Sequence, residues 1–341
     1  MGGEHYQGLV AAAQRDHLPL SVLAELTWRC PSRCLHCHFW PRGDEGRELS
    51  TARWTGIFGE LSAAGTLFLA LSGGEPLARA DFFELLEEAV RRGFFVTVLT
   101  SAHPLDDEGA RRLADAGPAM VQVSLYGADP AAYEGVTGLP GSFGRLRRNL
   151  ELLRRLGVPL SLKAPVLRST WRSLPDCFEF AASLGVPFKP DFTLFPDCQS
   201  PGGHPEMLDE AELAEALRLC RPHMPPPEPG STGPDDPLCA AGSRFAAIAP
   251  DGRVFACPYH AECAGDLAER SFGEIWRDSP VLDRFRRLTR RAWTRCAGCP
   301  DEPYCRRCPA LSALTGGSFT GISDYLCRMN RVQARLLAES P

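Results

Sequence analysis

The chain has 341 residues, of which 44% are hydrophobic and 23% are charged, and its formal net charge is −5. This composition is typical of a globular protein, the length suits one large and one smaller domain, and the acidic balance argues against a nucleic-acid partner. No apolar run reaches the roughly 18 residues of a membrane span, and residues 1–20 lack a signal-peptide pattern, so we expect no membrane partner and a cytoplasmic location.

Apolar strands and amphipathic helices alternate through residues 21–196. The strands are predicted at residues 21–27, 66–71, 94–100, 120–125, 160–166 and 188–194. The helices between them are predicted at residues 51–64, 81–92, 107–116, 143–156 and 172–184. This alternation predicts an α/β fold with a parallel sheet and right-handed crossovers, but periodicity does not distinguish an open sheet from a partial barrel.

The other segments differ from this region in composition. Residues 1–20 form an N-terminal extension, and residues 197–237 are rich in Pro and Gly with one helix near 209–219, which indicates a linker. Residues 238–330 combine weak periodicity with many cysteines and predict a small domain with little apolar core. Bound metal would then supply part of its folding energy. Residues 331–341 form a C-terminal tail.

Fourteen cysteines are the unusual feature of the composition. Because the chain has no export signal and the cysteines cluster at short spacings, metal or cluster ligation is a better interpretation than disulfides. Three cysteines stand apart and are predicted to be buried bystander thiols, since free cysteine behaves as a small hydrophobe. They are Cys177, Cys198 and Cys220.

The first cysteine group follows the first predicted strand directly. It consists of Cys30, Cys34 and Cys37. Three thiolates can hold three irons of a cubane cluster, and the missing fourth ligand leaves one iron open to a substrate or cofactor. Zinc is the alternative, with His36 or His38 as the fourth ligand, although zinc sites of this kind prefer C-x2-C pairs.

A glycine pair follows the second predicted strand in the segment Ser72-Gly73-Gly74-Glu75-Pro76. Paired glycines let the backbone approach a ligand closely. Together with the first cysteine group, this segment resembles the radical S-adenosylmethionine (SAM) superfamily. The resemblance implies a partial (βα)6 parallel barrel, with residues 73–76 binding the SAM amino group. SAM would chelate the open iron through its amino and carboxylate groups, and cleavage of SAM would give a 5′-deoxyadenosyl radical that abstracts hydrogen from substrate.

The same resemblance implies roles for residues that match the family pattern less specifically. His36 takes a position in the cysteine motif that is usually aromatic. Ser124 resembles a serine that contacts SAM, and Lys163 resembles a basic residue that meets the SAM carboxylate. The alternative for both is a polar strand-end residue that faces solvent. The segment Thr100-Ser101-Ala102 departs from the T-N-G of the family, which weakens any assignment there.

The C-terminal cysteines resemble the SPASM domain. Their pattern is Cys239-x12-Gly252-x4-Cys257, then Cys263, then Cys296-x2-Cys299-x5-Cys305-x2-Cys308, then Cys327. One spacing departs from the SPASM pattern, because two residues rather than three separate Cys305 from Cys308. The resemblance implies two auxiliary [4Fe-4S] clusters, and therefore three clusters in all. The second auxiliary cluster would take Cys296, Cys299, Cys305 and Cys327, and the first would take Cys239, Cys257 and Cys308.

Cys263 is the open question of this second group. It either completes the first auxiliary cluster or leaves that cluster with an open iron. A pair of zinc knuckles is the alternative for the whole region, but it explains Cys239, Cys257 and Cys327 poorly. Nearby acids such as Asp251 and Asp266 are candidate proton acceptors, although such residues more often cap turns.

SPASM-containing radical SAM enzymes act mainly on peptides or protein side chains. The resemblance therefore predicts an oxidoreductase that crosslinks or otherwise oxidises a side chain of a ribosomal precursor peptide. A separate peptide-recognition protein and an electron donor such as flavodoxin or ferredoxin are the expected partners. The alternatives are oxidation of a small metabolite such as a sugar or alcohol, and a non-catalytic electron carrier or zinc protein. An electron carrier needs neither an open cluster nor the Gly73-Gly74-Glu75-Pro76 segment.

Overall fold

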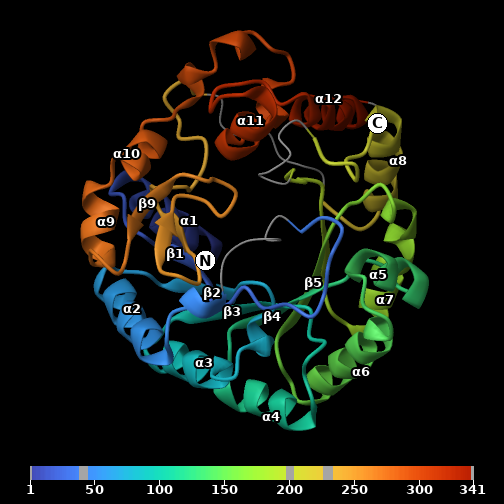
Figure 1. The fold of residues 1–341 in the computed structure, drawn as a ribbon. Helices are drawn as coiled ribbons and strands as arrows, with labels where there is room; N and C mark the ends of the chain where they lie inside the picture. The colour runs from blue at the N-terminus through green and yellow to red at the C-terminus, as the bar shows by residue number, and fades with distance from the viewer. Residues whose placement is uncertain (1, 38–44, 197–202, 226–232, 339–341) are drawn as a thin grey trace.

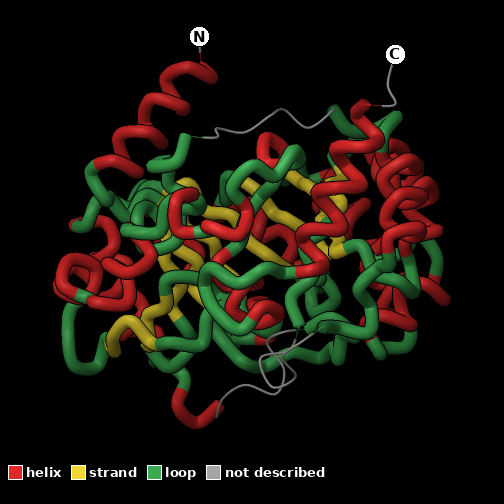
Figure 2. Tube along the Cα trace, turned by 90° about the horizontal axis from the view of Figure 1, so that it is seen from above, coloured by secondary structure: helices red, strands yellow, loops and turns green. Residues whose placement is uncertain are grey.

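The computed structural model describes residues 2–37, 45–196, 203–225 and 233–338. Helices surround a curved sheet, as Figure 1 shows, and Figure 2 shows the same sheet from above with the N-terminal helix at one side. Six parallel strands form the barrel wall in the order β6-β5-β4-β3-β2-β1. The predicted partial parallel barrel is therefore confirmed.

All six predicted barrel strands are present. They are β1 (Ser21–Glu25), β2 (Phe68–Ser72), β3 (Phe95–Thr100), β4 (Met120–Ser124), β5 (Leu160–Pro165) and β6 (Phe188–Asp191). Side chains alternate across them, so residues such as Val22, Leu69 and Val96 are fully buried under the outer helices. Their neighbours face the barrel interior, where Leu23 and Leu99 line a cavity.

The predicted barrel helices are also present. They are α2 (Thr51–Ala63), α3 (Phe82–Arg91), α4 (Asp107–Ala116), α6 (Ser142–Arg155) and α7 (Leu174–Leu184). Two helices were not predicted, α1 (Gly2–Arg15) within the N-terminal extension and α5 (Pro130–Thr137). The short α5 begins where Asp129 accepts hydrogen bonds from two backbone amides and ends at Gly138 in the left-handed region.

The helix of the predicted linker is part of the main fold. It is α8 (Glu210–Cys220), it contacts α7 and α12, and it buries Leu213 and Ala216. Cys177 in α7 and Cys220 in α8 are both buried, as predicted for bystander thiols. Cys198 lies outside the described residues.

The cysteine-rich region continues the barrel sheet. Strand β7 (Phe245–Ile248) pairs in parallel with β1, and β8 (Arg253–Phe255) and β9 (Cys263–Asp266) follow in antiparallel order. The domain boundaries predicted from composition stay a prediction, but hydrogen bonds of one sheet cross the predicted junction at 237–238. The remaining helices are α9 (Phe272–Asp278), α10 (Pro280–Arg286), α11 (Pro309–Gly316) and α12 (Asp324–Ala338).

Short 3-10 turns connect many of these elements. They are η1 (Glu45–Arg47), η2 (Pro76–Ala78), η3 (Trp171–Ser173), η4 (Arg290–Ala292), η5 (Thr294–Cys296) and η6 (Glu302–Tyr304). Across the described part of the chain, no helix is long and apolar enough to cross a membrane.

Candidate active site

The first cysteine group lies in the loop after β1, at the carboxyl ends of the barrel strands, where parallel barrels carry their sites. Helix α5 holds this loop, because the backbone N–H groups of Arg33 and Leu35 donate to the carbonyls of Thr137 and Val136 at 2.8 and 3.0 Å. A turn then closes the loop, with the N–H of Cys37 donating to the carbonyl of Cys34 at 3.1 Å. The unpredicted helix α5 is thus the support of the cysteine loop.

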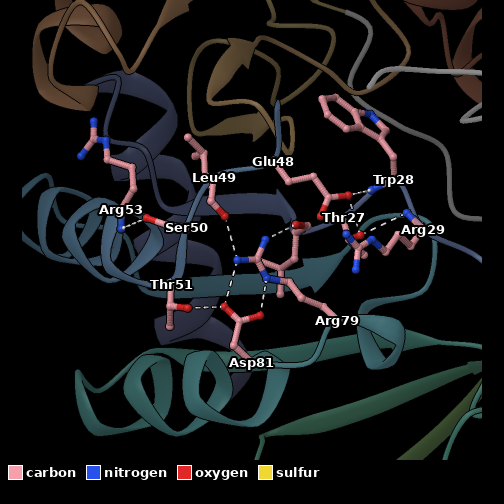
Figure 3. A network of polar contacts seen from close by, with 11 residues as sticks. Thr27, Trp28, Arg29, Glu48, Leu49, Ser50, Thr51, Arg53, Arg79 and Asp81 are labelled. Carbon is pink, nitrogen blue, oxygen red and sulfur yellow. Dashed lines mark hydrogen bonds and ion pairs between the residues drawn. The ribbon is translucent and has the colours of Figure 1, made fainter. Parts of the chain in front are cut away.

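The loop stem, residues 26–29, is fixed by two charged side chains that Figure 3 shows. Glu48 accepts hydrogen bonds from the Thr27 hydroxyl and the Trp28 amide, both at 2.7 Å. Arg79 donates to the carbonyls of Leu26 and Leu49 at 2.8 and 2.7 Å and pairs with Asp81 at 2.7 Å. Hydrogen bonds to a backbone segment from both sides leave it few other conformations. The stem therefore presents Cys30 from a fixed position.

The glycine pair packs against the same stem. The N–H of Gly74 donates to the Thr27 carbonyl at 2.7 Å, and the N–H of Glu75 donates to the Arg29 carbonyl at 2.8 Å. A Cβ at Gly73 would lie 2.5 Å from the Thr27 oxygen, and one at Gly74 would collide with the Arg29 carbonyl. Gly73 also has φ +131°, which side chains rarely adopt. The sequence predicted a close approach of these glycines to a ligand, and the structure shows their close approach to the loop stem.

Glu75 uses its carboxylate to fix the end of β3. It accepts hydrogen bonds from the Thr100 hydroxyl at 2.6 Å, the Ser101 amide at 2.7 Å, the Leu77 amide at 3.2 Å and the Ser101 hydroxyl. Burial raises the pKa of Glu75, and these hydrogen bonds oppose the rise. Ala102, which stands where the family has glycine, has φ +57°. The Thr100-Ser101-Ala102 departure therefore keeps a left-handed turn.

These elements enclose a first cavity of about 270 Å³. Its walls include all three cysteines of the loop together with Gly73, Gly74, Glu75, Ser124, Tyr126 and His36. Pro76 instead begins the turn η2, behind the cavity wall. Burial raises the pKa of Cys30 to about 11 and that of Cys34 to about 12, and the neighbouring cysteines add to both rises. Thiolates at these positions therefore need a bound cation, which the irons of a cluster would supply.

His36 and Tyr126 stand together in the cavity wall, with ring centroids 4.9 Å apart. Burial lowers the pKa of His36 to about 4, so the ring is neutral, and its Nδ1 has no hydrogen-bond partner among the described residues. A hydrogen bond from the Tyr126 hydroxyl opposes the rise in the pKa of Cys34, whose main cause is burial. The usually aromatic position of the motif therefore carries a neutral imidazole that lines the first cavity and a second one beside it, with a buried Nδ1 that has no partner among the described residues.

A second cavity of about 220 Å³ adjoins the first. The two cavities share His36, Leu99, Ser124, Tyr126 and Tyr259 in their walls. Lys163 lies in the second cavity, and its Nζ is 3.0 Å from Asp191 at the end of β6. The structure thus places Ser124 between the cavities and Lys163 beyond the first one.

Two residues of the second cavity were missed in the sequence. Asp191 closes the last barrel strand, and its position at a carboxyl strand end was the available signal. Tyr259 follows Cys257 by two residues, and its ring stacks on that of Phe195 with centroids 3.5 Å apart. This stack brings the C-terminal cysteine region into the wall of the barrel cavity, which no local pattern indicates.

The C-terminal cysteines fall into two sets by their mutual electrostatic influence. Burial raises the pKa of Cys239 to about 11 and that of Cys257 to about 12, with Cys308 adding to both rises. Burial also raises the pKa of Cys305 to about 11, and the other thiols of its set add to this rise. The three-cysteine set is Cys239, Cys257 and Cys308, and the four-cysteine set is Cys296, Cys299, Cys305 and Cys327.

Cys263 stands at the start of β9 and is exposed. Its thiol donates to the carbonyl of Gly265 at 3.2 Å. The two nearby acids are engaged in their own turns, since Asp251 pairs with Arg253 at 2.8 Å and Asp266 accepts from the amide of Ala268 at 2.8 Å. Both acids therefore act as turn caps.

Among the described residues, no three His, Cys, Asp or Glu side chains converge on the position of a single metal ion. A cubane cluster needs a wider arrangement, because each iron takes one thiolate and the thiolates lie around the cube. The two C-terminal sets and the loop cysteines have the donor chemistry of such clusters.

Comparisons with known proteins agree with this geometry. A family model described as the radical SAM superfamily matches residues 25–181, and one described as an iron-sulfur cluster-binding domain, SPASM, matches residues 239–309. PqqA peptide cyclase of Rhodopseudomonas palustris is 30% identical over 96% of this chain and 91% of its own length. AdoMet-dependent heme synthase of Methanosarcina barkeri is 27% identical over 90% of this chain and 96% of its own length.

Solved structures share the fold. The crystal structure of Streptococcus suis SuiB bound to S-adenosylmethionine superposes with a TM-score of 0.72 at 17% identity, over 93% of this chain and 80% of that chain. Native anSMEcpe with bound AdoMet and a peptide gives a TM-score of 0.72 at 16% identity, over 94% and 98% of the two chains. The chain belongs to the radical SAM superfamily and is an enzyme with a C-terminal SPASM domain. Its cofactors are iron-sulfur clusters and SAM.

Proposed function

We propose that this enzyme oxidises a side chain of a ribosomal precursor peptide and so forms a crosslink. The observation that carries the proposal is the pair of adjoining cavities, one walled by the loop cysteines and the other by Lys163 and Asp191. Relatives named PqqA peptide cyclase cover nearly the whole chain, and a SuiB structure holds its precursor peptide SuiA. A peptide side chain that enters the second cavity would meet a reactive centre in the first.

The cysteine sets support three [4Fe-4S] clusters. Cys30, Cys34 and Cys37 would hold the cluster with an open iron, which binds SAM beside Gly73, Gly74 and Ser124. When bound, this cluster and SAM supply a 5′-deoxyadenosyl radical that takes a hydrogen atom from substrate. The four-cysteine set would hold a fully ligated auxiliary cluster.

The three-cysteine set would hold the other auxiliary cluster, with Cys263 as its fourth ligand after a movement of β9. Cys263 is the natural candidate because it is exposed and bound only through a weak thiol contact to Gly265. Replacement of Cys263 by Ala in the full chain should leave the iron content near that of the parent but change the spectrum of one auxiliary cluster. An unchanged spectrum would mean that this cluster keeps an open iron.

His36 and Ser124 would meet SAM where the two cavities join. The neutral imidazole of His36 can accept or donate one hydrogen bond through Nδ1, which suits the edge of an adenine ring. Lys163, which sequence resemblance assigned to the SAM carboxylate, would instead hold Asp191 in place in the substrate cavity. A replacement of Lys163 should then change the use of substrate more than the binding of SAM.

Asp191 would take the proton that the oxidation releases. Loss of a hydrogen atom leaves a substrate radical, and closure of a new bond then releases one proton and one electron. The proton goes to the Asp191 carboxylate, which forms an ion pair with Lys163 in the substrate cavity. The electron leaves past the Tyr259–Phe195 stack toward Cys257 and passes to an external carrier such as flavodoxin or ferredoxin. A similar carrier would reduce the catalytic cluster, and a separate protein would deliver the peptide.

The test uses protein purified and reconstituted without oxygen. It should contain about 12 irons, as three four-iron clusters require, and release 5′-deoxyadenosine with reductant and SAM. A short peptide encoded beside the gene should lose the mass of two hydrogen atoms when coexpressed. Asp191→Asn should keep 5′-deoxyadenosine release and lose most of the modified peptide, with exposed Asp115→Asn as the control. Equal loss of both products in Asp191→Asn would contradict the proton-acceptor role.

Oxidation of a small metabolite is the second candidate. A relative named AdoMet-dependent heme synthase covers 90% of this chain, so the same two-domain framework also serves an enzyme named for a non-peptide product. A small molecule of modest size would fit a cavity of about 220 Å³. Release of 5′-deoxyadenosine that is stimulated by cell metabolites below peptide size, and not by the neighbouring peptide, would favour this candidate.

A further inference from the structure

Three buried arginine N–H donors without hydrogen-bond partners lie in the segments that carry the four-cysteine set. Within the described ranges, they are Nε of Arg307, Nη1 of Arg290 and Nε of Arg328. The Arg307 side chain is only 5% exposed and that of Arg290 only 11%. Buried guanidinium donors normally find acceptors, so unsatisfied ones indicate an acceptor that binds at this place.

One carboxylate serves both arginines. Arg307 donates to Glu302 at 2.8 Å and to the carbonyl of Arg290 at 3.3 Å. Nη1 of Arg290 lies 3.8 Å from the same carboxylate, too far for a hydrogen bond. Two buried positive charges therefore share one carboxylate, an arrangement that is costly in a protein interior unless another anion lies beside it.

The four-cysteine set is the place for that anion. The Asn330 amide donates to the sulfur of Cys305 at 3.3 Å, so Asn330 contacts a thiol of this set directly. Arg307 stands two residues after Cys305, and its side chain is buried. Four thiolate ligands make a [4Fe-4S] cluster an anion, and each electron that it accepts makes it more negative. Its sulfurs are also the acceptors that the unsatisfied N–H groups lack.

Charge and hydrogen bonding decide how readily a cluster accepts an electron. Positive charge and hydrogen bonds to sulfur favour the reduced form of a cluster.

We infer that Arg307, Arg290 and Asn330 raise the reduction potential of the cluster on the four-cysteine set. The inference rests on the proposed function, because it requires that auxiliary cluster. A higher potential there would favour the electron taken from substrate on this cluster over its return to the substrate radical. Arg307, Arg290 and Asn330 act through the cluster as tuning residues and do not touch substrate.

The test measures midpoint potentials in the full reconstituted chain. Cys30, Cys34 and Cys37 are replaced by Ala so that the auxiliary clusters alone contribute to electron paramagnetic resonance during a redox titration. Arg307→Gln should lower one of the auxiliary midpoints, with a tenfold change in the reduced-to-oxidised ratio at fixed potential, which is about 59 mV for one electron. Arg306→Gln removes the same charge from the exposed neighbouring residue and should shift neither midpoint.

A variant with the opposite expected shift in midpoint potential keeps the test decisive. Glu302→Gln removes the shared carboxylate and leaves more positive charge, so it should raise the same midpoint. Arg307→Lys retains the charge and should restore most of the potential if Arg307→Gln binds iron poorly. Unchanged midpoints in both Arg307→Gln and Glu302→Gln, with iron content intact, would overturn the inference. Absence of auxiliary iron in the unsubstituted chain would instead contradict the proposed function.

Intact enzyme gives a second readout. With the loop cysteines present, Arg307→Gln should release 5′-deoxyadenosine at the parent rate but yield less modified product for each SAM cleaved. A purely structural role would lower both in proportion. A parent-like ratio of product to 5′-deoxyadenosine, in a variant whose midpoint has fallen, would overturn the role of this cluster's potential in turnover.

Discussion

The two cysteine-bearing regions of the molecule differ in what holds them in place. The catalytic loop follows a stem that Glu48 and Arg79 fix by hydrogen bonds, and helix α5 holds the loop from its other side. The region around the four-cysteine set includes the turns η4, η5 and η6, none of which contains a buried residue, and within residues 290–306 only Trp293 is buried. Protein packing thus shapes the first region, and the turns of the second bury little apolar surface.

This difference has a physical consequence for how each site forms. Hydrogen bonds and packing preorganise the loop before any iron binds, so the cluster enters a site that already exists. Short turns bury little apolar surface and cannot offset their own conformational entropy, so the bound cluster has to supply folding energy. We therefore expect the catalytic region to survive metal loss and the four-cysteine region to lose its structure.

The largest expected effect concerns activity. Replacement of Cys30, Cys34 and Cys37 by Ala should reduce 5′-deoxyadenosine release to background, because no iron remains to bind SAM. The barrel should stay folded, since the stem contacts do not involve these thiols, and thermal unfolding monitored by circular dichroism checks this. Cys220→Ala, in buried α8, is the control and should retain SAM cleavage. Cleavage of SAM by the triple variant would contradict the site assignment.

Removal of iron should separate the two regions directly. After anaerobic chelation, amide hydrogen exchange should rise strongly across residues 290–308 and remain slow in β2 and β3. The strands keep their protection because their residues belong to the main core, whereas the turns lose the ligand that orders them. Equal protection of residues 290–308 with and without iron would show that this region also folds by protein contacts alone.

A smaller effect is expected from filling the space beside the loop stem. Gly74→Ala places a methyl group against the Trp28 and Arg29 carbonyls and should cost about 1–3 kcal/mol of unfolding free energy. Gly144→Ala, in the exposed part of α6 with open space around its Cβ, is the matched control. It should stabilise by about 0.5–1 kcal/mol, because alanine favours helix interiors. Chemical denaturation of both variants measures the difference in unfolding free energy. Equal values would show that the loop stem moves to accommodate the methyl group.

The smallest expected effect is at Ala102. Its φ of +57° strains alanine, and Glu75 holds the preceding residues in place. Ala102→Gly should relieve about 1–2 kcal/mol of this strain, which offsets the lost methyl packing and the greater freedom of unfolded glycine. It should therefore destabilise less than Ala110→Gly, which removes an equally buried methyl group from helix α4. Equal losses in the two variants, measured by denaturation, would mean that the turn is unstrained.

Much of the barrel was predictable because its signals are local. Alternating apolar residues such as Val96 and Val98 predicted β3, and the 3.6-residue period predicted helices such as α4. Helix α5 escaped because it is short and its Gly135 and Pro130 dilute the pattern. Its role in holding the cysteine loop also depends on hydrogen bonds to residues that lie about a hundred positions earlier in the chain. Such contacts leave no periodic signal.

The candidate site divides in the same way. The spacing of Cys30, Cys34 and Cys37 and the glycine pair identified the family, because residues that are near one another in the chain also lie near one another in space. Asp191, Tyr259 and Arg307 were missed, since an acid at a strand end or an arginine in a basic segment is unremarkable by itself. The proposed role of Lys163 also depends on its ion pair with Asp191, a contact that the sequence did not indicate.

The sequence by itself determined the cysteine motifs, the strand and helix order, and therefore the family and its cofactors. The tertiary structure decided which residues share a cavity, how β7 joins the cysteine-rich region to β1, and which charges surround each cysteine set. The physical reason is the distance along the chain over which each kind of signal acts. Motifs and periodicity record contacts between near neighbours in the chain, whereas cavity walls and electrostatic fields add contributions from residues that only folding brings together.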